Sequence, residues 1–234
     1  MKSANDSTLI RSFLHQTERL GGYIGRAASR ELRLRYTAIV QAEFDLRLAA
    51  LRPGDIALDL GANVGIYTKK LAATGALVHA FEPDPATFAR LTHEVGHLPN
   101  VVLHQKAVGA KDGLVHLARV RSNPRSRLDP SLGSSVVFRS GRMNVADIVA
   151  VEQIGFRKLL AGFDRDVAVI KMDIEGAEVE ILEDLVAKGL QDLGFSSLFV
   201  ETHEWQEPTL HRRIMAVRTA LEGITMPYFN LYWH

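Results

Sequence analysis

Short apolar runs alternate with segments of helical periodicity, and this alternation limits the fold more than any other feature. Ile56 to Leu60 follow the turn sequence Arg52-Pro53-Gly54 and stop at Gly61, as a buried strand of a parallel sheet would. Leu77 to Phe81 and Val101 to Val108 predict two more strands. The helix faces between them are Val64, Tyr67 and Leu71, and then Phe88, Leu91 and Val95. Strands and helices that alternate at such intervals require right-handed crossovers and form a parallel sheet with helices on both faces.

The second half of the chain resumes the pattern. Strands are predicted over Val167 to Met172 and Ser197 to Thr202, with a last short one within Tyr228 to Trp233. The corresponding helix faces are Val179, Leu182 and Val186, and then Leu210, Ile214, Val217 and Leu221. The predicted fold class is therefore α/β, with a doubly wound, mostly parallel, Rossmann-like sheet.

Two regions fall outside this alternation. Two helices are expected before the sheet, divided at Gly21-Gly22; their apolar positions are Leu9, Phe13 and Leu20, and then Leu32, Tyr36, Ile39 and Leu46. We expect residues 1–50 to form an N-terminal helical cap and residues 51–234 the sheet domain.

The segment from about residue 110 to 142 is rich in Arg, Ser, Gly and Pro, and we interpret it as an insertion or lid. Short strands are predicted in it at Val115 to Leu117 and Val136 to Phe138.

Composition excludes several classes of function. Twenty-eight basic and 27 acidic residues give a net charge of +1, which provides no overall field for a nucleic acid or an anionic membrane. The absence of cysteine excludes disulfides, thiolate zinc sites and a cysteine nucleophile. With no apolar run near the ~20 residues that cross a bilayer, and no apolar leader, we expect a cytoplasmic protein.

A glycine-containing turn follows the first predicted strand, in the sequence Asp59-Leu60-Gly61-Ala62-Asn63-Val64-Gly65. Glycine allows a sharp turn and a close approach of the backbone to a ligand, and the following helix offers unpaired N–H groups. Glu82 ends the second strand, where an acid in such folds binds ribose hydroxyls. A dinucleotide fingerprint would need glycine in place of Asn63 and Ile66, and a P-loop would need lysine after Gly65, so the sequence favours neither.

The remaining pattern, D-x-G-x-x-x-G with a following acid, resembles motif I of class I methyltransferases. Further stretches are similar to the FkbM-like methyltransferase family: Phe81 to Asp84, Ala107 to Gly109, Gly133 to Ser135 and, above all, Ile170 to Glu178 with its K-x-D-x-E-G-x-E pattern. This resemblance, over about Leu58 to Glu204, implies S-adenosylmethionine as cofactor and methylation of oxygen on sugars, polyketides or related small molecules. The cofactor-binding residues that it implies, together with the glycine turn, are Asp59, Gly61, Ala62, Asn63, Gly65, Glu82, Ala107, Val108 and Asp173.

Three residues are expected to carry the catalysis. An alcohol needs a general base before it attacks a methyl group, and Asp173, Glu175 and His203 are the candidates, with His203 as first choice. Strand alternation would put His203 on the same face as Glu201. Helix capping is the structural alternative for Glu175 and Glu178.

Further functions stay open at this point. Asp173, Glu201 and His203 could instead bind a divalent metal, as in metal-dependent O-methyltransferases, although the resemblance calls for no metal. An NAD(P)-dependent oxidoreductase and a non-catalytic cofactor-binding protein are the two rival functions.

Arginines of the insertion predict an anionic substrate, with a solvated loop as the alternative; they are Arg119, Arg121, Arg125, Arg127, Arg139 and Arg142. The aromatic stretch from Tyr228 to His234 predicts an edge strand or, alternatively, a homodimer contact.

Overall fold

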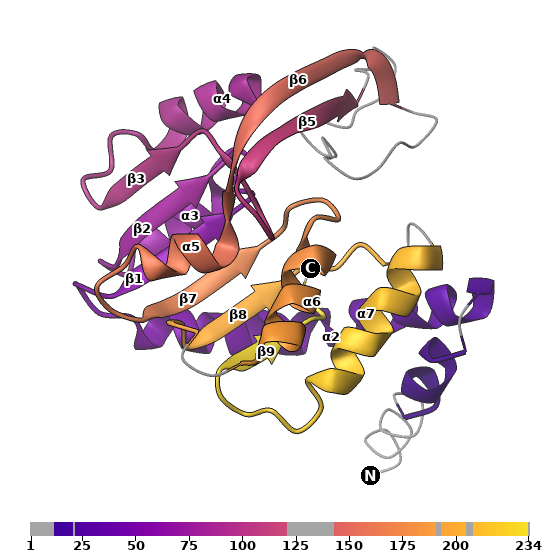
Figure 1. The fold of residues 1–234 in the computed structure, drawn as a ribbon. Helices are drawn as coiled ribbons and strands as arrows, with labels where there is room; N and C mark the ends of the chain where they lie inside the picture. Colours follow the sequence, from indigo (N-terminus) through magenta and orange to yellow (C-terminus); the bar gives the residue numbers. More distant parts are fainter. Residues whose placement is uncertain (1–11, 21, 121–142, 191–192, 205–207, 234) are drawn as a thin grey trace.

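The computed structural model describes residues 12–20, 22–120, 143–190, 193–204 and 208–233 (Figure 1). Its main sheet has six strands in the order β3-β2-β1-β7-β8-β9, and every neighbouring pair is parallel. The strands are β1 (Ile56–Leu60), β2 (Leu77–Phe81), β3 (Val101–His104), β7 (Val167–Met172), β8 (Ser197–Val200) and β9 (Tyr228–Asn230). This arrangement confirms the predicted doubly wound α/β fold, and the strand order reverses beside β1.

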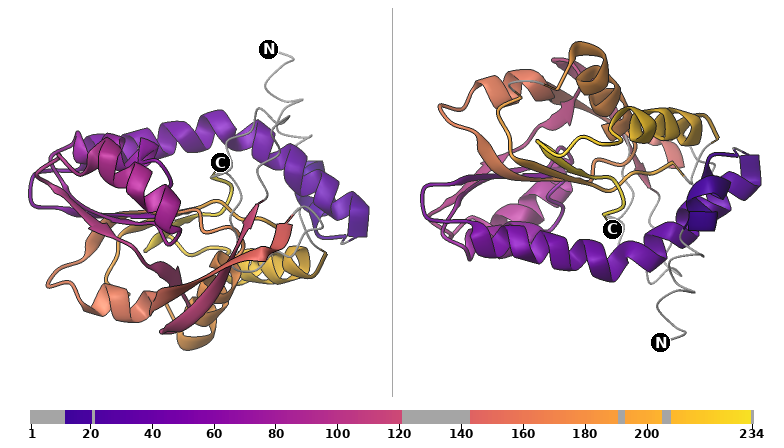
Figure 2. Two further views of the ribbon diagram at one scale, coloured as in Figure 1. Left: turned by 90° about the horizontal axis from the view of Figure 1, so that it is seen from above. Right: turned by 90° about the horizontal axis from the view of Figure 1, so that it is seen from below.

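Helices cover both faces of the sheet (Figure 2). One face carries α2 (Gly22–Ala50), α3 (Ile66–Ala72) and α4 (Pro85–Val95), and the other carries α5 (Phe156–Ala161), α6 (Glu178–Lys188) and α7 (Pro208–Ala220). Because each central strand is covered twice, both side-chain rows of β1 and β8 are buried. No helix of the described residues is long and apolar enough to cross a membrane.

The helices before the sheet differ in part from the expected apolar faces. Residues 12–18 are helical and α2 begins at Gly22, so the predicted division holds. Leu32 is buried, whereas Leu46 is 71% exposed, and the side chains that pack on the sheet are Val40 and Phe44. The prediction was wrong for Leu46 because a long helix on a sheet buries only the residues that face it.

The predicted strand from Val101 to Val108 is two strands. β3 ends at His104, and β4 (Ala107–Gly109) belongs to a second, three-stranded sheet with the order β4-β6-β5. The polar sequence His104-Gln105-Lys106 marks the point at which the chain leaves the main sheet.

The expected insertion contains more regular structure than its composition indicates. β5 (Gly113–Val120) includes the predicted strand Val115 to Leu117 and pairs antiparallel with β6 (Met143–Gly155), for which no strand was predicted. The two strands form an arm that projects from the main sheet (Figure 1), and β6 also pairs parallel with β4. The other predicted strand, Val136 to Phe138, lies outside the described residues.

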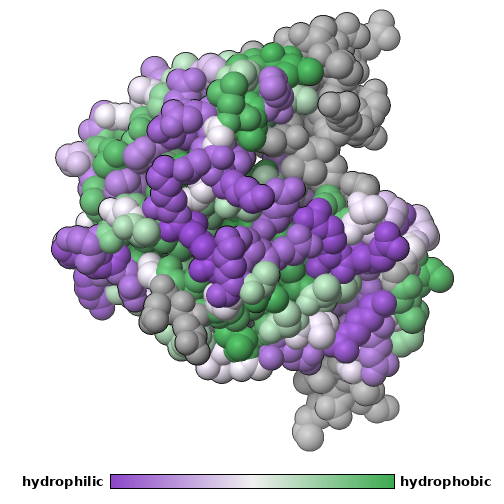
Figure 3. Space-filling view, in the orientation of Figure 1, coloured by the Kyte–Doolittle hydropathy of each residue, from purple (hydrophilic) through white to green (hydrophobic). Residues whose placement is uncertain are grey.

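Hydrophobic side chains remain exposed on this arm. Leu114 on β5 is 68% exposed and Ile148 on β6 is 45% exposed. On the face shown in Figure 3, hydrophobic residues lie over the arm, among the more numerous hydrophilic ones.

Candidate active site

Residues that follow three adjacent strands meet at one edge of the sheet. Gly61 follows β1, Glu82 follows β2, and Asp173 follows β7. Since all six strands are parallel, their carboxyl ends form a single edge, where open α/β sheets bind their ligands. A cavity opens there, with about 640 Å³ of atom-free space that is continuous with solvent. Its lining is Gly61, Asn63, Phe81, Glu82, Pro83, Lys106, Ala107, Val108, Leu117, Asp173, Ile174, Glu175 and Ala177.

The glycine turn is shaped by two close approaches. Gly61 has φ +78°, and a Cβ atom there would lie 1.8 Å from the backbone oxygen of Asp173. Gly65 has φ +85°, and its Cβ atom would lie 2.9 Å from side-chain atoms of both Leu91 and Val95 on α4. Both positions therefore require glycine, the first against β7 and the second against α4.

Asp59 and Lys171 form a buried pair beneath this turn. They are register partners on β1 and β7, and Lys171 Nζ lies 3.2 Å from Asp59 Oδ1. Lys171 also donates a hydrogen bond to the carbonyl oxygen of Gly61 (2.6 Å), and Thr68 donates one to Asp59 (2.6 Å). Asp59 has no exposed surface, so its contacts stabilise the glycine turn from below.

Glu82 is held by backbone groups at the cavity wall. The N–H groups of Asn63 and Asp84 donate to its two carboxylate oxygens, at 3.0 and 2.9 Å. Burial raises the pKa of Glu82 to about 7, although both N–H donors and Lys171 act against this shift. The sequence placed this acid correctly at the end of a strand, and its carboxylate links the glycine turn to the following loop.

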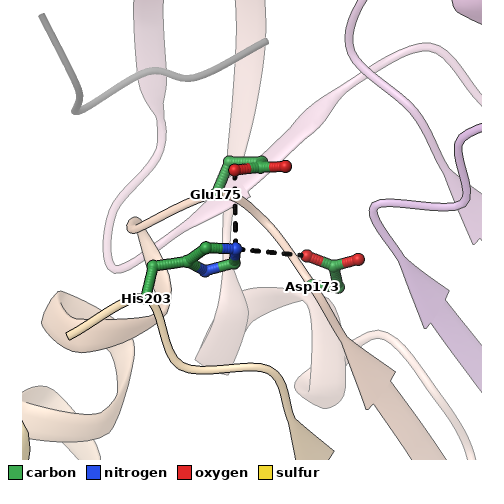
Figure 4. Close-up of side chains that lie close together, drawn as sticks. All are labelled: Asp173, Glu175 and His203. Atoms are coloured by element: carbon green, nitrogen blue, oxygen red, sulfur yellow. Dashed lines mark ion pairs between the residues drawn. The ribbon is translucent and has the colours of Figure 1, made fainter. Parts of the chain in front are cut away.

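The three predicted catalytic side chains converge at the mouth of the cavity. His203 Nε2 lies 3.4 Å from Glu175 Oε2 and 3.8 Å from Asp173 Oδ1 (Figure 4). On its other side, His203 Nδ1 lies 2.8 Å from Oε1 of Glu178, which also accepts a hydrogen bond from the His203 backbone N–H. His203 is 4% exposed, and Glu178 is fully buried.

This clustering of carboxylates shifts the titration of its members. Burial would lower the pKa of His203, but Glu178, Glu175 and Asp173 together raise it to about 10. Burial raises the pKa of Glu175 to about 7 and also raises the pKa of Asp173. In this arrangement the imidazole therefore carries a proton at neutral pH.

The structure brings most of the predicted site residues to the cavity. Seven of them are part of its lining: Gly61, Asn63, Glu82, Ala107, Val108, Asp173 and Glu175. Asp59, Ala62, Gly65 and His203 lie behind that lining. β8 ends at Val200, so strand alternation does not extend to Glu201 and His203. Glu201 lies 4.0 Å from Arg33 of α2.

Sequence reasoning missed three residues that support this site. Lys171 could have been noticed as a charged residue within an apolar strand run. Glu178 was interpreted mainly as a helix cap; it does accept a hydrogen bond from Gly176 N (2.7 Å), but it also holds His203. Arg33 donates to Thr202 (2.5 Å) and Glu204 (3.1 Å), contacts between distant parts of the chain that no local pattern indicates.

Known proteins share sequence similarity with most of this chain. The family model of the methyltransferase FkbM domain matches residues 59–220. A hexuronic acid methyltransferase, AglP, of Haloferax volcanii is 29% identical over 163 residues, which cover 70% of this chain and 62% of that protein. The 31-O-demethyl-FK506 methyltransferase FkbM of Streptomyces tacrolimicus is 28% identical over 174 residues, covering 71% of this chain and 60% of its own length.

The chain thus matches about three-fifths of the length of these two curated relatives. Among solved structures, a putative rRNA-methylase from Clostridium thermocellum has a TM-score of 0.42 at 11% identity, over 81% of this chain and 83% of that one. The family model covers well over half of the chain and includes both the glycine turn and the Asp173 region. The chain accordingly belongs to the FkbM methyltransferase domain family.

Proposed function

We propose that this protein transfers a methyl group from S-adenosylmethionine to a hydroxyl group of a small, sugar-like molecule. One observation carries the proposal: a glycine turn, an acid at the end of β2 and a cluster of titratable side chains lie at or directly behind the wall of the same cavity. The names of the two relatives support the acceptor class, since one acts on a hexuronic acid and the other on an O-demethyl compound.

The cavity fits the proposed cofactor. Gly61 contributes only backbone to the cavity lining, because the carbonyl oxygen of Asp173 occupies the position where its Cβ atom would lie. Glu82 would accept hydrogen bonds from the ribose hydroxyls of the cofactor. Ala107 and Val108 would border its adenine ring, beside the apolar Phe81 and Leu117. When bound, S-adenosylmethionine supplies an electrophilic methyl group on its sulfonium sulfur. Asp59 would act indirectly, through Lys171 and the carbonyl of Gly61.

Asp173, Glu175 and His203 would act on the acceptor. Asp173 and Glu175 face the cavity, with side chains that are each 30% exposed, whereas His203 is buried behind them. In-line attack requires mainly that the acceptor oxygen be held in position and lose its proton, and this cluster supplies polar atoms for both tasks. The arginine hypothesis for an anionic acceptor stays a prediction, because all six arginine side chains lie outside the described ones.

The first test is titration calorimetry with S-adenosylhomocysteine, using NAD as the control ligand. We expect micromolar binding that Gly61→Val and Glu82→Ala both abolish, and no binding of NAD. A transfer assay against uronic acids and hydroxylated macrocycles then tests the acceptor class. Binding without turnover of any hydroxylated acceptor would favour the non-catalytic alternative, whereas preferential NAD binding would favour the oxidoreductase.

A further inference from the structure

We propose that Asp173, Glu175 and His203 form a binding site for a divalent cation at the mouth of the cavity. Each residue offers one ligand atom, and the three atoms all lie within 4.8 Å of one another. In Figure 4 the imidazole nitrogen and both carboxylates point toward a common region. This ligand set differs from the sequence-based alternative, because Glu175 takes the place of Glu201.

The distances suit a shared cation. Nε2 of His203 is 3.4 Å from Glu175 Oε2 and 3.8 Å from Asp173 Oδ1. A direct charge-assisted hydrogen bond would be about 2.7–2.9 Å long. Neighbouring ligand atoms around a cation bound at about 2.1 Å lie about 3.0–3.4 Å apart, so small side-chain rotations would complete the site.

The surroundings of His203 are those of a metal ligand. Glu178 contacts Nδ1 at 2.8 Å and so leaves Nε2 directed at the two carboxylates. A carboxylate behind the imidazole fixes the orientation of the ring and increases its basicity, as is usual for metal-binding histidines. Glu178 is itself fully buried, and the Gly176 N–H group donates to its other carboxylate oxygen, so both oxygens have partners.

The local charges also favour a cation. Asp173, Glu175 and Glu178 face His203, while Lys171 Nζ lies 3.8 Å from Asp173 Oδ2 and is shared with Asp59. The other oxygen of Asp173, Oδ1, lies 3.8 Å from Nε2 of His203. A divalent cation would offset the excess of carboxylates and take the place of a proton on the ring.

The site has the open form of a catalytic metal site. Its three ligands follow β7 and β8, and two of them line the cavity, so remaining coordination positions would face the acceptor. A coordinated hydroxyl group becomes more acidic and is held in a fixed direction. This catalytic role depends on the proposed methyl transfer, whereas binding of the cation does not.

Manganese provides a direct test, because one imidazole and two carboxylates are suitable ligands and the free ion can be followed by electron paramagnetic resonance. We expect metal-free full-length protein to bind one Mn²⁺. Asp173→Asn, Glu175→Gln and His203→Gln should each weaken binding at least about tenfold, with Glu178→Gln weakening it less. Glu180→Gln, a change of an exposed acid on α6, is the matched control and should leave Mn²⁺ affinity unchanged. Circular dichroism checks that every variant is folded.

The outcomes separate this proposal from the proposed function. Folded protein that binds S-adenosylhomocysteine but no Mn²⁺ at millimolar concentration would overturn the cation site and leave methyl transfer standing. Protein that binds Mn²⁺ but not S-adenosylhomocysteine would support the cation site and contradict the proposed methyl transfer. If Glu201→Gln removes Mn²⁺ binding while Glu175→Gln does not, the ligand set proposed here is wrong.

Discussion

Gly61 shows how the absence of a side chain allows close packing between segments that are far apart in the sequence. Its backbone passes so close to Asp173 that a methyl group would have to overlap the carbonyl oxygen. The turn after β1 and the acid after β7 are therefore positioned relative to one another by contact, and the side of the cavity that they share cannot widen without separating the strands.

We predict that Gly61→Ala will lower the stability of the protein by more than the cost of its positive φ alone. Gly54 is the matched control, since it has φ +96° and a Cβ atom there would have no neighbour within 4 Å. Gly54→Ala should cost roughly 1–2 kcal/mol in the free energy of unfolding, and Gly61→Ala clearly more, with loss of S-adenosylhomocysteine binding. Urea unfolding and calorimetry measure both quantities. Equal costs for the two variants would show that β7 moves aside freely.

Glu82 predicts a pH dependence of cofactor binding. Because its pKa is about 7, this carboxyl group is partly protonated in the free protein at neutral pH. The ionised form is the better acceptor of hydrogen bonds from the ribose hydroxyls. The affinity for S-adenosylhomocysteine should therefore rise as pH increases through about 7 and level off above about 8.

Glu82→Gln isolates this effect. The variant should bind more weakly and lose the part of the pH dependence that belongs to this carboxyl, while proton uptake or release on binding, measured in buffers of different ionisation enthalpy, should change accordingly. An unaltered pH profile in Glu82→Gln would assign the titration to another group, such as Glu175 of the His203 cluster.

The sequence predicted those site residues whose role follows from their position on a strand. Gly61, Glu82 and Asp173 could be located because a strand end and a motif coincide there. Glu178 and Lys171 could not be assigned to the site, because their roles depend on which side chains they meet across the sheet. The sequence also named His203 as the first-choice base without indicating its protonation, which depends on three carboxylates from another segment.

At the scale of elements, α2 is joined to the end of β8 by buried charges. Arg33 contacts Thr202 and Glu204, and Glu204 also accepts a hydrogen bond from Arg218 of α7 (2.9 Å). Amphipathic periodicity could locate the helix but not this arginine on its inner face. The pairing of β5 with β6 was missed although β6 is rich in Val and Ile, because the residues between the two strands have the composition of a loop.

Arg33→Met should destabilise the protein by about 2–4 kcal/mol, since it leaves the buried Glu204 with one arginine partner fewer. Arg35→Met on the same helix removes an exposed pair with Glu31 and should cost less than about 1 kcal/mol. Chemical denaturation of both variants at low and high salt provides the measurement. A cost for Arg33→Met as small as that of the control would mean that α2 is held by apolar packing alone.

At the scale of the whole molecule, the boundary predicted near residue 50 divides one hydrophobic core. Phe44 of α2 has no exposed surface, and its ring packs edge-on against Phe199 of β8, with centroids 5.1 Å apart. The same cluster includes Val169 of β7 and Trp233 near the C-terminus. The division into a cap of residues 1–50 and a domain of residues 51–234 stays a prediction, and we do not expect the two parts to unfold separately.

Phe44→Ala should lower the stability of the entire protein by about 3–5 kcal/mol, with a single unfolding transition retained. Leu46→Ala, which changes a residue that is 71% exposed on the same helix, should shift stability by at most about 0.5 kcal/mol. Differential scanning calorimetry compares the two. A second transition, with only the earlier one moved by Phe44→Ala, would indicate that the helix unfolds independently.

The position of β1 between β2 and β7 has a consequence for synthesis of the chain. β1 and the glycine turn leave the ribosome early, but the neighbour of β1 on one side, β7, and the carbonyl against which Gly61 packs come far later. Until then β1 has an unpaired apolar edge, which is a target for chaperones and for association with other nascent chains. Ligand-binding competence should thus arise late and abruptly during translation, and slow closure of this long-range pairing would govern how fast the protein matures.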